Sequence, residues 1–168
     1  TGSIYEVMSA PISAFEVIIG YVGAAATKSI IISFLILLTA TFFVSFEIKH
    51  PFWMFSLLVI TGITFSLFGF IIGIWASNFE KLQLIPLIII TPLVFLGGSF
   101  YSTSMLSNFW KTITQLNPIF YIINGFRWSF FGTSDVAIHI SLSCIAIFLF
   151  LCIIIVSIIF KTGYKIRD

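Results

Sequence analysis

Long uninterrupted apolar runs dominate this chain, and short polar breaks separate them. An α-helix needs about 20 mostly apolar residues to cross the hydrocarbon of a bilayer. A strand of a membrane barrel would instead alternate apolar and polar positions, and these runs do not alternate. The pattern therefore predicts an all-α integral membrane fold whose four transmembrane helices lie at residues 18–46, 52–76, 80–101 and 138–160.

The composition excludes a water-soluble domain. Of the 168 residues, 60% are hydrophobic and 8% are charged, whereas a soluble domain carries about 25% charged residues. Only a lipid bilayer supplies surroundings apolar enough for such a surface. The net charge of +2 is small and dispersed, so we expect no nucleic acid among the partners.

Basic residues at the ends of the uncharged apolar runs predict the orientation. Four spans place both chain ends on one side of the membrane. The basic residues counted for that side are Lys28, Lys81, Lys161, Lys165 and Arg167, against Lys49, Lys111 and Arg127 for the other side. Basic residues concentrate on the cytoplasmic side, and the count therefore places both ends of the chain in the cytoplasm.

The segment before the first apolar run carries its own helix signals. Ser3 and Glu6 have the spacing of a capping box, as do Ser13 and Glu16. Pro11 disfavours helical backbone at the residue before it. The sequence thus predicts a short cytoplasmic helix within residues 3–13, separate from the first span.

Small residues form a stripe along the second apolar run, at spacings of three and four. They are Gly62, Ser66, Gly69, Gly73 and Ser77. Small residues let helices approach closely inside a membrane. The stripe either packs against another helix of this chain or forms the seam of a dimer, and the sequence leaves both interpretations open.

The third apolar run is irregular. It contains Pro86 and Pro92 and ends near Gly97 and Gly98. Each proline removes a backbone hydrogen bond from a helix, and irregular backbone at membrane depth requires protein or a water-filled cavity beside it. The run therefore either lines a path or acts as a hinge, although prolines also occur in transmembrane helices without a transport role.

Residues 105–131, between the last two spans, are predicted to form a re-entrant hairpin on the outer side. Leu106, Phe109, Ile113 and Leu116 repeat at helical spacing, which predicts an amphipathic helix lying in the interface. Asn117–Pro118 ends that helix. The aromatic segment that follows, 119–131, is apolar enough to enter the membrane and too short to cross it.

Arg127 is a permanent cation within this apolar hairpin, and it has two interpretations. Its guanidinium can reach for the outer headgroups and stack on Trp128 or Phe126. Alternatively it is a functional cation near an outer vestibule, paired with an acidic substrate, a lipid phosphate, Asp135 or Glu47.

The chain has no motif for chemistry of its own. A Gly-x-x-x-x-Gly-Lys-[Ser/Thr] loop is absent, so ATP hydrolysis by that route is not expected. His50 and His139 stand apart and have no ligand cluster around them. We therefore expect no enzyme activity, no catalytic or metal site and no cofactor in this chain.

Three stretches in this order resemble one known family: "GSIYEVMSAPIS", "PLVFLGGSFYSTSML" and "LNPIFYIINGFRWSFFG". The chain resembles the permease subunits of type-2 bacterial ABC transporters, which export drugs, polysaccharides and lipid-linked molecules. Such subunits usually have six spans. The resemblance therefore implies a single permease domain over residues 1–168 that corresponds to the C-terminal four spans and is incomplete at its N-terminus.

The resemblance also implies partners and sites. A separate ABC ATPase subunit would hold ATP and Mg²⁺ and dock on the segment 3–13, and a second permease copy would complete a homodimer in the bacterial inner membrane. The implied ATPase-coupling residues are Ser3, Tyr5, Glu6, Ser9 and Pro11. The path or interface residues are Gly69, Gly73, Pro86, Pro92, Gly97 and Gly98, and those of an outer gate are Asn117, Pro118, Arg127 and Trp128.

The expected function is thus that of the transmembrane subunit of an ATP-driven exporter. The alternative is a membrane scaffold without transport activity, whose small-residue stripes simply bind other helices.

Overall fold

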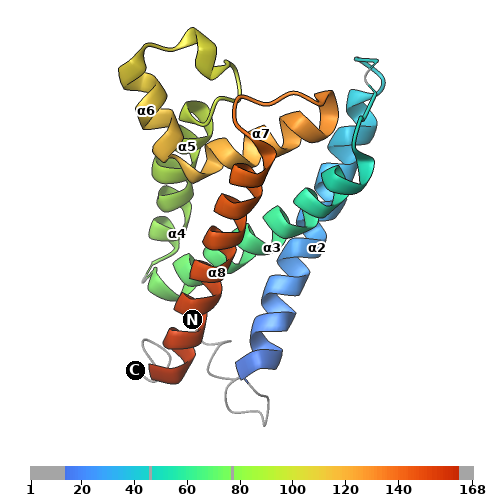
Figure 1. Cartoon of the computed structure of the whole chain (residues 1–168). Helices are drawn as coiled ribbons and strands as arrows, with labels where there is room; N and C mark the ends of the chain where they lie inside the picture. Colours follow the sequence, from blue (N-terminus) through green and yellow to red (C-terminus); the bar gives the residue numbers. More distant parts are fainter. Residues whose placement is uncertain (1–13, 46, 77, 163–168) are drawn as a thin grey trace.

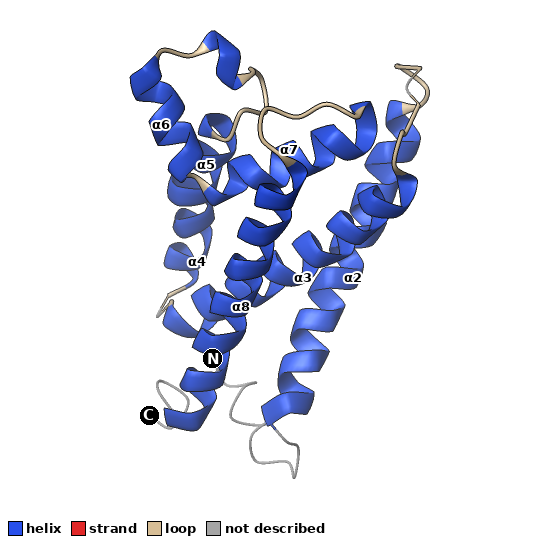
Figure 2. Cartoon of the chain, viewed as in Figure 1, coloured by secondary structure: helices blue, strands red, loops and turns tan. Residues whose placement is uncertain are grey.

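The computed structural model describes residues 14–45, 47–76 and 78–162. The predicted segment 3–13 and Ser77 lie outside these residues. Within them every regular element is a helix and there is no strand, which confirms the all-α prediction (Figure 2). Four helices are long and apolar enough to cross a membrane: Phe15–Ala40, Pro51–Trp75, Phe79–Leu96 and Ile138–Thr162.

Three long helices form a bundle. They are α2 (Ala14–Ala40), α3 (Pro51–Trp75) and α8 (Ile138–Thr162). Helix α3 packs against both of the others (Figure 1). One apolar cluster joins the three helices and consists of Val22, Leu67, Cys152 and Val156.

The third span is a composite helix. It consists of α4 (Phe79–Ile85), a π-helical turn η1 (Pro86–Ile90) and α5 (Thr91–Leu96). Within η1 the N–H of Thr91 donates to the Pro86 carbonyl, five residues back. The wider turn lies between the two prolines, each of which removes an N–H from the helical ladder. The irregularity predicted for this span therefore takes the form of a π turn.

Two short helices lie at one end of the bundle, which we call the hairpin end. They are α6 (Asn108–Leu116) and α7 (Pro118–Phe131), and the 3₁₀ turn η2 (Thr103–Met105) precedes them. Helix α7 crosses the ends of the long helices and contacts α3, α5, α6 and α8 (Figure 1). The short helices fall in the predicted hairpin region, and their depth in a bilayer remains a prediction.

Two helices end earlier than their spans were predicted to end. Helix α2 ends at Ala40 instead of residue 46. There the Thr39 hydroxyl donates to the carbonyls of Leu35 and Ile36, and the Thr41 hydroxyl donates to that of Leu38. Of these acceptors, the Leu38 carbonyl is among the last four of the helix, which a helix terminus leaves open. The third span ends at Leu96 instead of 101, just before Gly98 takes the positive φ of 85°.

One premise of the charge count is wrong. Lys28 was assigned to the cytoplasmic flank, but it lies in the interior of α2, 14 residues after Ala14 and 12 before Ala40. A central position means that Lys28 does not mark either end of the span.

Helix α7 is the most buried element at the hairpin end, although its sequence predicts a segment that enters the membrane. Its buried residues are Ile119, Phe120, Ile122, Asn124, Gly125 and Ser129. Ile122 packs with Leu57 of α3 and Ile145 of α8. By contrast α6 buries only Thr114 and exposes Phe109, Trp110 and Leu116. The aromatic side chains of the hairpin are thus divided between the protein core and its surface.

Gly97 allows the third span to meet α7. A Cβ atom at this position would lie 2.9 Å from Cδ1 of Ile123 and 3.3 Å from Cγ2 of Ile119. Both distances are shorter than an ordinary van der Waals contact of about 3.5–4.0 Å between carbon atoms. A Cβ at this position would force Ile123 and Ile119 to shift, so glycine permits the close contact between α5 and α7.

We expect Gly97→Ala to destabilise the protein by about 1–3 kcal/mol, the usual cost of overpacking a close contact. The matched control is Gly62→Ala, where the added Cβ would lie 3.9 Å from both the Ala26 carbonyl oxygen and Ser29 Cβ. Thermal unfolding of the purified full-length protein in detergent measures the difference. Equal midpoints for the two variants would contradict the steric role of Gly97.

Candidate functional site

The guanidinium of Arg127 is the centre of a polar cluster at the hairpin end. Its Nη1 donates to Oδ2 of Asp135 at 3.1 Å, and its Nη2 donates to the carbonyls of Gly98 at 2.6 Å and Tyr101 at 3.2 Å. The side chains of Arg127 and Asp135 are only 23% and 13% exposed. One side chain of α7 thus joins the segment after α5 to the segment before α8.

Asp135 has further partners. Its Oδ1 accepts from the Ser102 hydroxyl at 2.6 Å and its Oδ2 from the Thr103 N–H at 2.7 Å. Its own N–H donates to Oδ1 of Asn124, a fully buried residue of α7, at 2.8 Å. Each contact connects the segment before α8 either to α7 or to the loop after the third span.

The environment of Asp135 favours the charged carboxylate. Burial alone would raise its pKa, but hydrogen bonds from Ser102 and Thr103 and the charge of Arg127 outweigh burial and hold the pKa below the ordinary aspartate value. The pair is therefore ionised at neutral pH.

Asn117 connects two helix ends. Its side-chain N–H donates to the Leu93 carbonyl near the end of α5 at 2.6 Å, and its Oδ1 accepts from the Ile119 N–H at 3.0 Å. The second bond is an N-cap, and Pro118 follows at the first helical position, where the absence of an N–H costs nothing. The Asn-Pro pair thus starts α7 and holds its first turn against the third span.

The last turn of α7 is held by the start of α3. The N–H groups of Lys49 and His50 donate to the carbonyls of Phe130 and Ser129. The rings of His50 and Trp128 stack with centroids 4.2 Å apart, and Trp53 meets Trp128 edge-on. Both ends of α7 are therefore attached to spans that are far apart in the sequence.

These contacts bear on both interpretations of Arg127. Its donors turn to two carbonyls and to Asp135, and Trp128 stacks on His50, so the described residues do not contain the expected stack on Trp128. The reach of Arg127 toward outer headgroups remains a prediction. The pairing with Asp135 is one of the alternatives that the sequence left open, and the structure contains it. A gating role for Asn117, Pro118, Arg127 and Trp128 remains a prediction.

The predicted path residues do not share one environment. Gly97 and Gly98 are buried against α7 and within the polar cluster, whereas Gly69 and Gly73 are exposed on α3. Pro86 and Pro92 flank the π turn of the third span.

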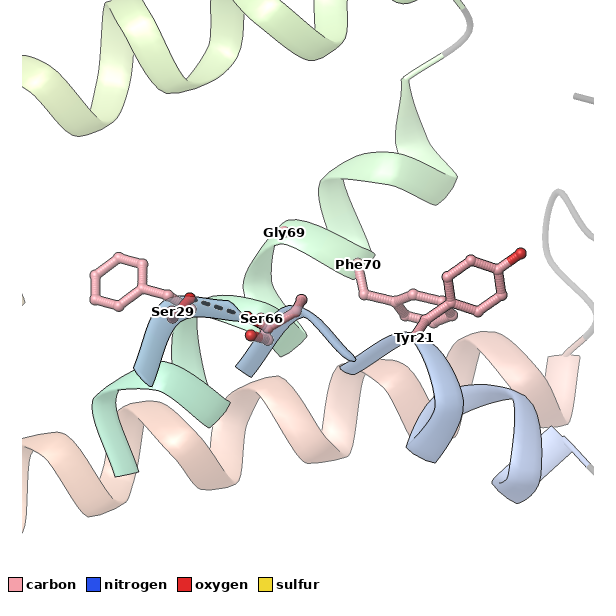
Figure 3. A pocket seen from close by; sticks show the side chains of 7 residues that line it. Tyr21, Ser29, Ser66, Gly69 and Phe70 are labelled. Atoms are coloured by element: carbon pink, nitrogen blue, oxygen red, sulfur yellow. Dashed lines mark hydrogen bonds between the residues drawn. The ribbon is translucent and has the colours of Figure 1, made fainter. Parts of the chain in front are cut away.

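Gly69 lies in a groove of about 360 Å³ between α2 and α3. Figure 3 shows Tyr21 and Ser29 of α2 on one side, with Ser66, Gly69 and Phe70 of α3 facing them. The small-residue stripe therefore packs within the chain at Gly62, near Ala26, and leaves space open at Gly69 and Gly73.

Sequence reasoning missed several members of the polar cluster. Asn124, Ser102 and Tyr101 were not singled out, although Asn117, Asn124 and Arg127 follow one another at spacings of seven and three. Such spacing places polar residues on one face of a helix, and this signal could have identified the buried face of α7. The predicted coupling residues Ser3, Tyr5, Glu6, Ser9 and Pro11 lie outside the described residues.

Comparison with known proteins gives consistent matches. A family model described as ABC-2 type transporter matches residues 1–131. The inner membrane transport permease YadH of Escherichia coli (strain K12) is 35% identical over 147 residues, which cover 88% of this chain and 57% of the relative. Nodulation protein J of Neorhizobium galegae is 27% identical over 137 residues, 80% of this chain and 52% of that protein.

The chain therefore spans slightly more than half the length of these curated relatives. No solved structure matches it significantly.

Replacing Asp135 with Asn should destabilise the hairpin end by about 1.5–3 kcal/mol, the usual range for a hydrogen bond to a charged group. Arg127 would retain its two carbonyl partners and lose its counter-charge. Lys111→Gln is the control, because Lys111 is an exposed cation of the same hairpin. Thermal unfolding in detergent should show a lower midpoint for Asp135→Asn alone, and an unchanged midpoint would contradict a stabilising ion pair.

The pH dependence follows from the lowered pKa of Asp135. Because the pKa of Asp135 is lower in the folded protein, the ion pair contributes its full stabilisation at every pH above the pKa of the unfolded chain, about 3.9. This stabilisation is lost as the pH falls through the pKa of the folded protein. The midpoint difference between wild type and Asp135→Asn should thus stay constant from pH 8 to 5 and shrink below pH 4. A difference that already disappears near pH 6 would show that another group controls the cluster.

Proposed function

The chain belongs to the ABC-2 type transporter family, and on this premise we propose that it forms part of the transmembrane subunit of an ATP-driven exporter. Its relative in Escherichia coli is named as an inner membrane transport permease. In this proposal two permease copies enclose the substrate path in a bacterial inner membrane, and a separate ABC ATPase subunit supplies the energy. The curated relatives extend beyond the matched region, so the activity proposed is that of the whole protein.

The third span is the observation that carries the proposal. Two prolines and a π turn lie within it, and no residue of Phe79–Leu96 is buried by the rest of the described chain. Irregular backbone at membrane depth is tolerated beside protein or a water-filled cavity and not beside lipid. The exposed side of this span is therefore assigned to the path and to contact with a second permease copy.

The way the span is held supports motion of its far end. Its hairpin end is attached to α7 through Gly97, Asn117 and the carbonyls that Arg127 binds. Its other end, at Phe79 and Glu80, is exposed. A composite helix attached at one end can pivot there, with the π turn as the deformable point.

Coupling to the ATPase is assigned to the segment 3–13, which directly precedes α2 in the sequence. ATP and Mg²⁺ belong to the partner subunit in this proposal, and the permease supplies only the docking surface. Drugs, glycans and lipid-linked molecules are all compatible as substrates with the apolar third span.

Co-purification of the full-length protein with its ATPase subunit in nanodiscs tests this assignment. We expect a stable complex in which the permease changes ATP turnover severalfold, together with ATP-dependent export in vesicles. Glu6→Ala and Tyr5→Ala should leave membrane insertion intact and reduce the stimulation of ATP turnover. Lys111→Gln is again the control, since Lys111 lies at the opposite end of the bundle. Failure to associate with any ATPase would favour the scaffold alternative.

The role of the hairpin in transport has a separate test. If the hairpin acts as a gate, Arg127→Gln should reduce export more strongly than it reduces the amount of protein inserted in the membrane. Export per inserted molecule, compared with wild type in vesicles, measures this. An unchanged ratio would make Arg127 a structural residue only.

A further inference from the structure

Lys28 is a cation in the middle of a predicted membrane span. At about 1.5 Å per residue it lies roughly 20 Å from either end of α2. The contact with the neighbouring helix agrees with this depth. Gly62, near the middle of α3, approaches the Ala26 carbonyl and Ser29, which flank Lys28 on α2. Lys28 is therefore close to the centre of both helices.

A charged residue at this depth requires a partner. A lysine at the centre of a spanning helix costs about 2.5–3.5 kcal/mol on insertion scales, and such residues usually face protein or water and pair with another group. Lys28 is exposed, and it makes no ion pair or side-chain hydrogen bond with another described residue.

The described carboxylates lie at other levels. Glu16 is in the first turn of α2, Glu80 is in the first turn of α4, and Glu47 and Asp135 are in the loops at the hairpin end. A second copy arranged side by side in the same orientation would present these same carboxylates at the same levels. The hydrocarbon ends about 15 Å from the bilayer centre and the lipid phosphates lie beyond that edge, out of reach of a lysine side chain at the centre. A protein group that neutralises Lys28 at this level therefore has to be a carboxylate at mid-membrane depth.

The surface around Lys28 has the form of a helix-docking face. Gly20, Ala24 and Lys28 follow at intervals of four, so they share one side of α2, and all three are exposed. A Cβ at Gly20 would meet nothing within 4 Å. Tyr21 and Ser29, which directly follow Gly20 and Lys28 in the sequence, line the groove between α2 and α3. Small residues allow close approach of another helix inside the membrane.

We infer that the face formed by Gly20, Ala24 and Lys28 binds a further membrane-spanning helix, and that an Asp or Glu of this helix pairs with Lys28. The helix is supplied by polypeptide outside the 168 residues. The small residues set the distance of approach, and the ion pair sets the rotation and depth of the incoming helix. This inference rests only on the packing of α2 and α3 and does not depend on the proposed export function.

A lipid-soluble carbodiimide tests the pair directly in membranes that contain the full-length protein and its partner subunits. The reagent adds to a protonated carboxyl group and gives an O-acylisourea. The free-base form of the Lys28 amine then attacks the acyl carbon, an amide bond forms, and the dialkylurea leaves with the carboxyl oxygen. The product is a zero-length cross-link that mass spectrometry of the digest identifies.

We expect one abundant cross-linked peptide that joins the α2 peptide containing Lys28 to an apolar peptide with a single Asp or Glu. In Lys28→Arg the charge is kept but the amine is lost, so this product should fall at least tenfold while the amount of protein stays the same. Lys111→Arg is the matched control and should leave the product unchanged.

Three results would overturn the inference. They are recovery of the Lys28 peptide without any cross-link, a link to Glu16 or Glu80 of this chain or of a second copy, and attachment of Lys28 to a lipid or another small anion. Because the readout is a covalent bond, these results are independent of whether the protein stimulates an ATPase.

Discussion

A permanent positive charge in an apolar protein has to be neutralised and fully hydrogen-bonded, and this requirement organises the hairpin end. The guanidinium of Arg127 has five donors and cannot be deprotonated. Its bonds to Asp135 and to the carbonyls of Gly98 and Tyr101 satisfy several of these donors. Meeting this requirement brings together α7, the loop after the third span and the loop before α8, so one charge fixes the relative positions of three segments.

Helix α7 is central to the packing because both of its faces are used. Its apolar positions meet α3 and α8 through Ile122, and its polar positions Asn117, Asn124 and Arg127 bind the surrounding loops and carbonyls. Buried polar groups cost free energy unless they are paired, and here the partners of these three side chains come from α7 itself and from three other segments. A shift of α7 would therefore break hydrogen bonds at several places at once. This helix thus fixes the positions of the spans relative to one another at the hairpin end.

The sequence predicted features that depend on local composition and missed those that depend on distant contacts. Continuous apolar runs indicated four spans, and Pro86 and Pro92 indicated the irregular helix, since each of these signals is contained in one segment. The burial of α7 was missed because its apolar and aromatic residues predicted a segment that enters the membrane, and only the packing with Leu57 and Ile145 shows that it lies in the protein core. Lys28 was counted as a flanking residue because the uncharged run begins only at Ser29, although the predicted span 18–46 already contains it.

The two ends of the third span are held differently, and this difference determines how the span can move. At the hairpin end the span is held by steric fit at Gly97 and by hydrogen bonds to Leu93 and Gly98, whereas Phe79 and Glu80 at its other end are exposed. Displacing the free end exchanges apolar contacts for others of similar strength, since apolar side chains gain little by leaving lipid. Displacing the attached end would remove the Leu93 carbonyl from Asn117 and the Gly98 carbonyl from Arg127. Motion of this span is therefore cheapest as a pivot about the hairpin end, and the π turn between Pro86 and Ile90 is the place where its backbone can bend.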